Sequence, residues 1–125
     1  MIVSVGVDAV EIERIRALLE RSGERFERRV FTPSEADYCR GRQRPAESFA
    51  ARFAAKEAVM KCLGTGWTEG AAFREIEVVR GAGGEPTLSL AGPAAARAAQ
   101  LSIRRWHVSL THTDTTATAF VVAEG

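Results

Sequence analysis

The sequence predicts an α+β domain in which an antiparallel-rich sheet carries helices, including one long helix, on one side. Three observations lead to this fold class. Residues 2–7 alternate apolar side chains with a period of two, which indicates a strand. Residues 46–63 carry apolar side chains at helical spacing, which indicates a long helix. The second half of the chain returns to short strand-like segments at 75–79, 87–90, 106–111 and 116–123.

The length of 125 residues is that of one ordinary domain, so we expect residues 1–125 to form a single folded unit. No apolar run reaches the roughly 20 residues that span a bilayer, and the N-terminus lacks the features of a signal peptide. We therefore expect a cytoplasmic protein that does not use a membrane. A formal net charge of +1 argues against general nucleic-acid binding. Cys39 and Cys62 form no CxxC pair, so no zinc site or disulfide framework is indicated.

Capping signals predict where the first helices begin and end. Asp8 and Glu11 have the spacing of a capping box, which predicts a helix that follows the first strand and ends at residues 22–23. Thr32 and Glu35 form a second such pair with a proline between them, which predicts a short helix that ends near residue 38 or 39. An alanine-rich segment after Gly92-Pro93 predicts the last helix.

The longest predicted helix ends at Gly64, a natural stop. One helical face should enter the core, and its members are Phe49, Phe53, Met60 and Leu63. Lys56 projects between these apolar side chains. A lysine in that position must reach out to solvent, pair with an acid or contact a bound anion.

Glu57 lies beside the core face of this helix, and its small helical neighbours leave room for a ligand or an ion: Ala50, Ala54 and Ala58. Lys61 follows one turn later, so the ordinary interpretation is an exposed pair that contributes about 0.3–0.5 kcal/mol. The ordinary interpretation of Asp8 is a helix cap. The alternative is that Asp8 and Glu57 converge on Mg²⁺, which is commonly held by one or two carboxylates together with water and phosphate. The spacing of these residues leaves both interpretations open.

The strand at 106–111 places His107 and Ser109 on one face, whereas His112 has the parity of the apolar face. A serine near a histidine suggests a hydrolase, but the chain has no GxSxG turn. A hydrogen-bonded structural histidine is the better default for both positions. The glycine pair around Thr65 follows a helix rather than preceding one, and no P-loop motif is present.

Three segments resemble the holo-acyl-carrier-protein synthases, the short bacterial 4′-phosphopantetheinyl transferases. They are residues 6–15, GVDAVEIERI; residues 52–66, RFAAKEAVMKCLGTG; and residues 107–113, HVSLTHT. The resemblance extends over nearly the whole chain, although Cys62 and Trp67 depart from the usual pattern. It implies the α+β fold of that superfamily and a homotrimer with active sites between subunits. The sequence itself shows no heptad and no exposed apolar stripe that would require a trimer.

The resemblance also implies the reaction. The 4′-phosphopantetheine group would pass from coenzyme A to a serine of apo-acyl carrier protein, releasing adenosine 3′,5′-bisphosphate, in fatty acid or polyketide biosynthesis. Asp8 and Glu57 would be the Mg²⁺ ligands, and Lys61 would contact phosphate as the third catalytic residue. The base stays open between Glu57 and a metal-bound water.

The same resemblance implies two binding surfaces. The residues expected to contact coenzyme A are Arg42, Arg44, Arg52, Lys61, Gly64, Gly66 and His107. The residues expected to meet the acidic carrier protein are Arg14, Arg21 and Arg25. Charge pairing of this kind mainly speeds encounter and weakens with salt.

Two other functions stay open on the residues alone. A metal-dependent phosphohydrolase would use the same Asp8 and Glu57 and would release pantetheine phosphate without an acceptor. A non-enzymatic module would bind an acidic partner through its arginine-rich first half and would tolerate Asp8→Ala and Glu57→Ala. RNA is the least favoured partner, because the sequence shows no aromatic stacking platform.

Overall fold

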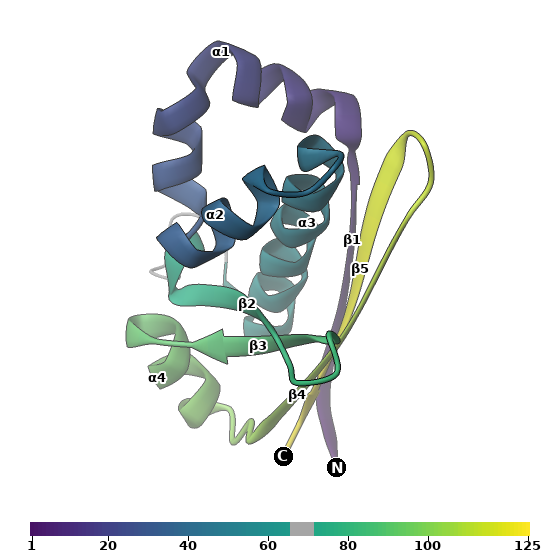
Figure 1. The fold of residues 1–125 in the computed structure, drawn as a ribbon. Coiled ribbons are helices and arrows are strands. Elements are labelled where there is room, and N and C mark those ends of the chain that lie inside the picture. The colour runs from purple at the N-terminus through teal and green to yellow at the C-terminus, as the bar shows by residue number, and fades with distance from the viewer. Residues whose placement is uncertain (66–71) are drawn as a thin grey trace.

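A computed structural model of the chain describes residues 1–65 and 72–125, and it confirms the predicted α+β class. The elements, in chain order, are β1 Ile2–Glu11, α1 Ile12–Val30, α2 Pro33–Arg40, α3 Pro45–Leu63, η1 Phe73–Glu75, β2 Ile76–Arg80, β3 Pro86–Leu90, α4 Gly92–Gln100, β4 Arg105–His112 and β5 Thr116–Glu124. Three strands form an antiparallel sheet in the order β1-β5-β4, and β2 and β3 form a separate antiparallel pair. Figure 1 shows the helices on one side of the three-stranded sheet.

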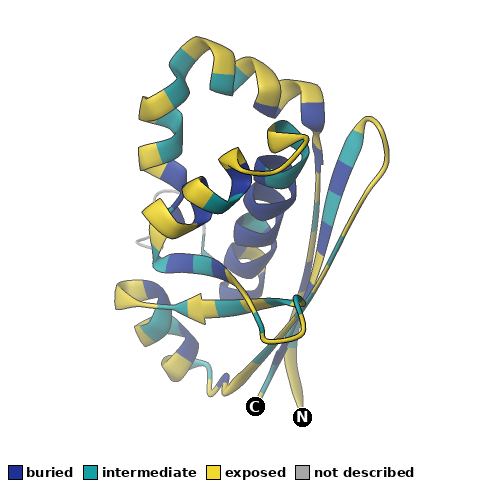
Figure 2. Ribbon diagram, in the orientation of Figure 1, coloured by how far each residue is buried: buried dark blue, intermediate teal, exposed yellow. Residues whose placement is uncertain are grey.

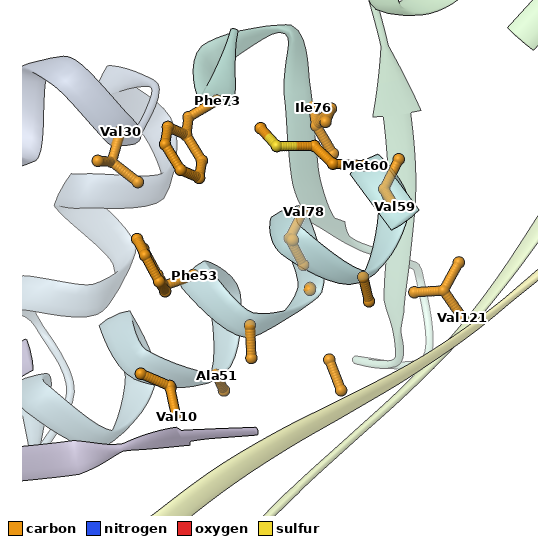
Figure 3. Close-up of a cluster of buried hydrophobic side chains, with 14 of the residues drawn as sticks. Val10, Val30, Ala51, Phe53, Val59, Met60, Phe73, Ile76, Val78 and Val121 are labelled. Carbon is orange, nitrogen blue, oxygen red and sulfur yellow. The ribbon is translucent and has the colours of Figure 1, made fainter. Parts of the chain in front are cut away.

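The long helix α3 fills the centre of the molecule and packs against β1 and β5 (Figure 1). Figure 2 shows it as the most continuously buried element, and Figure 3 shows its side chains among those of β2 and β5. The four residues predicted to face the core are confirmed as buried: Phe49, Phe53, Met60 and Leu63. The side chains that β5 turns toward α3 are small and fully buried: Ala117, Ala119, Val121 and Ala123. Small residues on this face let the helix lie close to the sheet.

Lys56 takes the second of its three predicted outcomes, because it pairs with an acid inside the core. Its Nζ lies 2.7 Å from Glu35 Oε1, and both side chains are almost completely buried. The same ammonium donates to the carbonyl oxygens of Phe73, at 2.9 Å, and Ile76. The Glu35 carboxylate also accepts from the backbone N–H groups of Thr32 and Val78. This buried group of contacts therefore ties α2 and α3 to β2.

The predicted start of the first helix is wrong. Asp8 does not cap a helix, because β1 continues to Glu11 and pairs there with Thr116 of β5. α1 begins at Ile12 without a side-chain cap, and it continues past Gly23, where the backbone leaves helical geometry and the helix kinks (Figure 1). The capping box at Thr32 is confirmed, since its hydroxyl accepts from the N–H of Glu35.

The outer face of the three-stranded sheet carries exposed apolar side chains. Val3, Val5 and Val7 share one face of β1, as the alternation predicts, and they are 39%, 55% and 53% exposed. Phe120 of β5, which pairs with Val7, is 48% exposed. The sequence-based view that no exposed apolar stripe exists is therefore wrong. Alternation alone does not tell which face of a strand meets the helices.

The termini lie together at one end of the sheet (Figure 1), where the N–H of Gly125 donates to the carbonyl of Met1 at 2.8 Å.

Among the described residues, no helix combines the length and apolar character needed to cross a bilayer.

Candidate active site

The candidate active site begins where β1 lies along α3, a contact we call the α3–β1 seam. Ser4 Oγ donates to the carbonyl of Cys62 at 3.0 Å. Further along the seam, Lys61 Nζ donates to the carbonyl of Val7 at 2.9 Å and to Asp8 Oδ1 at 3.2 Å. The inward face of β1 holds Asp8 opposite α3, because Asp8 pairs with the buried Ala119 of β5. The seam thus joins two of the predicted catalytic residues directly.

A glycine makes this close approach possible. A Cβ atom on Gly6 would lie 2.1 Å from the carbonyl oxygen of Ala58, so only glycine fits there without movement of the backbone. Ala50, Ala54 and Ala58 are completely buried. Their small size therefore serves packing within the core, and the prediction that they leave room beside Glu57 for a ligand is wrong.

Gly6→Ala should push β1 away from α3 and lower the free energy of unfolding by about 1–3 kcal/mol, the usual range for overpacking. Urea denaturation measures the change. Gly41→Ala is the matched control, because Gly41 has ordinary right-handed backbone angles and its added Cβ would meet nothing closer than 3.6 Å. The control should be neutral or stabilising by up to about 1 kcal/mol. Equal changes in the free energy of unfolding for Gly6→Ala and Gly41→Ala would show that the close contact between β1 and α3 does not require glycine.

Glu57 lies half-buried on α3, close enough to Asp8 for the two carboxylates to repel each other. Burial raises the pKa of Glu57 above its ordinary value, and the charge of Asp8 raises it further. The charges of Arg14 and Lys61 act in the opposite direction. Two carboxylates from β1 and α3 and two cations therefore meet at one place, as the functional interpretation of Asp8 and Glu57 predicts.

The raised pKa of Glu57 predicts a pH dependence of stability in metal-free protein. A carboxyl group that holds its proton more tightly when folded stabilises the fold most below its unfolded pKa, and this contribution is lost as pH rises through the folded pKa. Wild type should therefore lose stability relative to Glu57→Gln as pH rises above the ordinary value of 4.5. Urea denaturation in EDTA across this range tests the sign. A stability difference independent of pH would contradict the shift.

A second group of predicted residues surrounds a cavity of about 280 Å³ between α2 and the start of α3, which we call the arginine pocket. It is lined by Arg42, Arg44 and Arg52, all three expected from the sequence. His112 also lines it, and its Nε2 lies 3.7 Å from Glu47 Oε1. Positive charge gathered around a cavity suits an anionic ligand such as a phosphate.

Arg52 is the least exposed of these arginines, at 7%. Its terminal nitrogen donates to Ser48 Oγ at 3.1 Å, but its buried Nε has no hydrogen-bond partner among the described residues. A buried donor without a partner costs stability unless a ligand satisfies it. An acceptor bound beside Arg52 would supply the partner that this atom lacks.

The structure does not bring every predicted ligand-binding residue together. His107 is not in the arginine pocket, because its Nε2 lies 2.9 Å from Glu124 Oε1 near the other end of β4. Gly64 ends α3 in the left-handed conformation, with φ of 69°, and this explains its identity without a ligand. Gly66 and Trp67 lie outside the described residues.

The three arginines predicted to meet the carrier protein are exposed on α1. The guanidinium of Arg14 lies 5.8 Å from the centre of the Phe53 ring, and its charge reaches Glu57. Arg21 and Arg25 stand on opposite sides of the kink at Gly23. The sequence analysis ended this helix at residues 22–23, whereas in the structure α1 kinks at Gly23 and continues to Val30, so Arg25 lies beyond the kink from Arg14 and Arg21.

Among the residues of the arginine pocket that sequence reasoning missed are His112 and Tyr38. The parity of His112, on the apolar face of β4, was a usable signal, because that face turns toward α3. Tyr38 gave no signal, since a tyrosine near the end of a short helix is usually an ordinary packing residue.

Comparison with known proteins agrees over the full length of the chain. A family model described as the 4′-phosphopantetheinyl transferase superfamily matches residues 4–120. The chain is 46% identical over 124 residues to the holo-[acyl-carrier-protein] synthase of Koribacter versatilis, with 99% of each chain covered. It is 52% identical over 128 residues to that of a Methylobacterium species, with 99% of this chain and 95% of the relative covered.

Solved structures give the same result. The holo-[acyl-carrier-protein] synthase of Neisseria meningitidis matches with a TM-score of 0.88 and 36% identity over 100% of both chains. The Helicobacter pylori protein of the same name, in complex with coenzyme A, matches with a TM-score of 0.85 and 28% identity over 97% of this chain and 100% of that one. The chain therefore belongs to the holo-[acyl-carrier-protein] synthase family within the 4′-phosphopantetheinyl transferase superfamily.

Proposed function

We propose that this protein transfers the 4′-phosphopantetheine group of coenzyme A to a serine of apo-acyl carrier protein. The observation that carries the proposal is the meeting of Asp8, Glu57 and Lys61 at the α3–β1 seam, because it joins carboxylates and a cation from two distant parts of the chain. The family membership agrees with this reaction. Since coenzyme A is a metabolite of the cytoplasm, we place the protein there.

We further propose that Asp8 and Glu57 hold Mg²⁺. Their mutual repulsion is relieved by a cation, and both offer the hard oxygen ligands that Mg²⁺ prefers. Within residues 1–65 and 72–125 no third acidic, histidine or cysteine side chain joins them in a metal-binding group. Mg²⁺ commonly binds through one or two carboxylates and completes its shell with water and substrate phosphate, so the residues present fit this ion.

The transfer itself requires little of the protein beyond position and charge. The serine hydroxyl loses its proton to a base, for which Glu57 is the candidate in this chain, as its oxygen forms a bond to the β-phosphorus of coenzyme A. The bond from that phosphorus to the bridging oxygen breaks, and adenosine 3′,5′-bisphosphate leaves with the electron pair of that bond. Bound Mg²⁺ would neutralise charge on the two linked phosphates. Lys61, whose side chain is 55% exposed beside Asp8, would add a positive charge at the same phosphates. The arginine pocket would hold the nucleotide end of coenzyme A.

Intact-protein mass spectrometry of an apo-acyl carrier protein tests the reaction. The carrier is incubated with this protein, coenzyme A and Mg²⁺, and reactions with EDTA or with Asp8→Ala run in parallel. We expect the mass to increase by one phosphopantetheine and the gain to be lost in both controls. Release of pantetheine phosphate without any gain in carrier mass would replace the transferase by a phosphohydrolase. No turnover of coenzyme A at all, by folded protein, would leave only a binding function.

Acidic carrier protein should dock on α1, and charge reversal there should weaken the docking. Arg21→Glu is a cleaner test than Arg14→Glu, because the charge of Arg14 also acts on Glu57. We expect Arg21→Glu to raise the KM for carrier protein about three- to tenfold at low salt, and to spare the KM for coenzyme A. Arg104→Glu, next to β4 at the opposite end of the molecule, should change neither. Equal effects of the two changes would remove α1 from the interface.

We also propose that three chains assemble. The uncovered face of β1 and β5 supports an interface, since a contiguous exposed apolar face usually marks a contact surface. Sedimentation equilibrium should give the mass of three chains, and Val5→Asp should reduce it to one. Val79→Asp is the matched control, because Val79 is another exposed valine, at 39%, but lies on the separate β2–β3 pair. A monomeric wild type would overturn the trimer and leave the transferase proposal standing.

A further inference from the structure

Three guanidinium groups converge on the ring of Tyr38. The guanidinium carbons of Arg52, Arg80 and Arg42 lie 4.5, 5.0 and 5.4 Å from the centre of the ring. Arg80 also donates a hydrogen bond to the Tyr38 hydroxyl. One aromatic side chain at the end of α2 thus gathers cations from three elements: the loop after α2, helix α3 and strand β2.

The convergence is not balanced by acidic side chains. Within residues 1–65 and 72–125, none of these three guanidinium groups forms an ion pair with a carboxylate. Each attraction to the Tyr38 ring is modest, about 0.5–2 kcal/mol. Like charges brought this close repel, and the buried Nε of Arg52 has no hydrogen-bond partner among the same residues. An anion bound among the three guanidinium groups would offset their mutual repulsion.

A second cavity, of about 360 Å³, adjoins the arginine pocket and shares Tyr38, Arg42 and Arg52 with it. The rest of its lining consists of Arg80, Gly84, Pro86 of β3 and three residues of β4, from Val108 to Leu110. Arg80 therefore faces the same space as two residues already expected to bind coenzyme A. Nothing in the sequence motifs pointed to Arg80, because it lies at the exposed end of a short strand outside all three of them.

We propose that Arg80 is a further anion-binding residue of this site and that Tyr38 is the residue that positions it. Arg80 and Arg52 would contact the 3′-phosphate of the nucleotide together with Arg42, and Tyr38 would hold the three guanidinium groups in place before the ligand arrives. The proposal rests on coenzyme A being the substrate. It adds that Arg80 gives the protein its preference for a nucleotide that carries the 3′-phosphate.

Isothermal titration calorimetry with two nucleotides tests this assignment without metal, carrier protein or turnover. Adenosine 3′,5′-bisphosphate carries the additional phosphate, and adenosine 5′-monophosphate lacks it. We expect Arg80→Ala to weaken binding of the bisphosphate at least about tenfold, the usual effect of losing a charged hydrogen bond. Binding of the monophosphate should change less than about twofold. Arg74→Ala, an exposed arginine on η1, is the matched control and should change neither affinity.

Variants of Tyr38 test whether its ring positions the guanidinium group of Arg80 or only packs β2 against α2. Tyr38→Phe keeps the ring and removes only the hydroxyl that accepts from Arg80, so it should retain part of the preference for the bisphosphate. Tyr38→Leu removes the ring and should lose the preference as completely as Arg80→Ala does. If Tyr38→Leu does not fold, Tyr38→Phe and Arg80→Lys, which keeps the charge but not the planar fork, give the same comparison.

Each outcome has one meaning. Equal weakening of both nucleotides in Arg80→Ala, or no weakening of either, overturns the assignment of Arg80. An unchanged preference in Tyr38→Leu overturns the role of Tyr38. If wild type binds neither nucleotide and transfers nothing to carrier protein, the proposed function fails instead. If wild type binds the bisphosphate and transfers normally, only the roles of Arg80 and Tyr38 are in question.

Discussion

Glu57→Gln should reduce transfer to carrier protein on the order of 10²- to 10³-fold, the usual cost of losing one strong electrostatic contact in an active site. The amide keeps the size of the carboxylate and therefore keeps the packing, but it removes the charge that we propose binds Mg²⁺ together with Asp8. The rate of phosphopantetheine transfer at saturating coenzyme A measures the loss. Far-ultraviolet circular dichroism should show an unchanged fold.

A direct measurement of metal binding tests whether Glu57→Gln loses activity because it loses a metal ligand. Mn²⁺ binding, followed by electron paramagnetic resonance without substrates, should weaken in Glu57→Gln and in Asp8→Asn. Glu24→Gln neutralises an exposed carboxylate that pairs with Arg28 on α1, so it should leave both the rate and Mn²⁺ binding unchanged. Substantial turnover by Glu57→Gln in excess Mg²⁺ would refute the assignment of this residue as a ligand.

Lys56→Met should lower the free energy of unfolding by about 3–5 kcal/mol, the usual cost of removing one partner of a buried ion pair. The substitution leaves the Glu35 carboxylate charged and buried, and it leaves the carbonyl oxygens of Phe73 and Ile76 without their lysine donor. A loss of this size is comparable with the whole stability of many small domains. Urea denaturation at neutral pH measures it.

A double substitution tests whether the loss comes from the unpaired charge. Lys56→Met with Glu35→Gln removes both charges, while the glutamine oxygen can still accept from the N–H of Thr32 or Val78. The double variant should therefore be more stable than Lys56→Met alone. Lys61→Met is the control on the same helix, because Lys61 is exposed and its pairing contributes at most about 1 kcal/mol. Equal losses in Lys56→Met and Lys61→Met would contradict the importance of burial.

The features that sequence analysis predicted correctly depend on near neighbours in the chain. The capping box at Thr32 and the stop at Gly64 are set within four residues, and both are confirmed. The spacing of Asp8 to Glu11, which predicts a helix cap, is equally local. The true structure is decided by β5, more than 100 residues away, whose pairing extends β1 to Glu11. Local sequence signals cannot tell whether a residue will cap a helix or will extend a strand that pairs with a segment from the other end of the chain.

In the candidate site, too, local patterns were predictable from the sequence and contacts between distant segments were not. The periodicity of α3 placed Lys56 among apolar neighbours and stated its possible outcomes, but only the fold shows that Glu35, 21 residues earlier, is its partner. The closeness of Asp8 and Glu57 was implied by a family resemblance and not by their spacing. Tyr38 could not be found at all, because its role arises where a loop, a helix and a strand meet around one ring.

The uncovered face of β1 and β5 makes folding and assembly parts of one mass-action equilibrium. If Val5, Val7 and Phe120 lose their contact with solvent only when chains meet, the unfolding temperature will rise with protein concentration, because association stabilises the native chain. Dilution would then weaken the enzyme even though no covalent or local change occurs. The amount of enzyme in a cell would set how much of it is folded, as well as how fast carrier protein is modified.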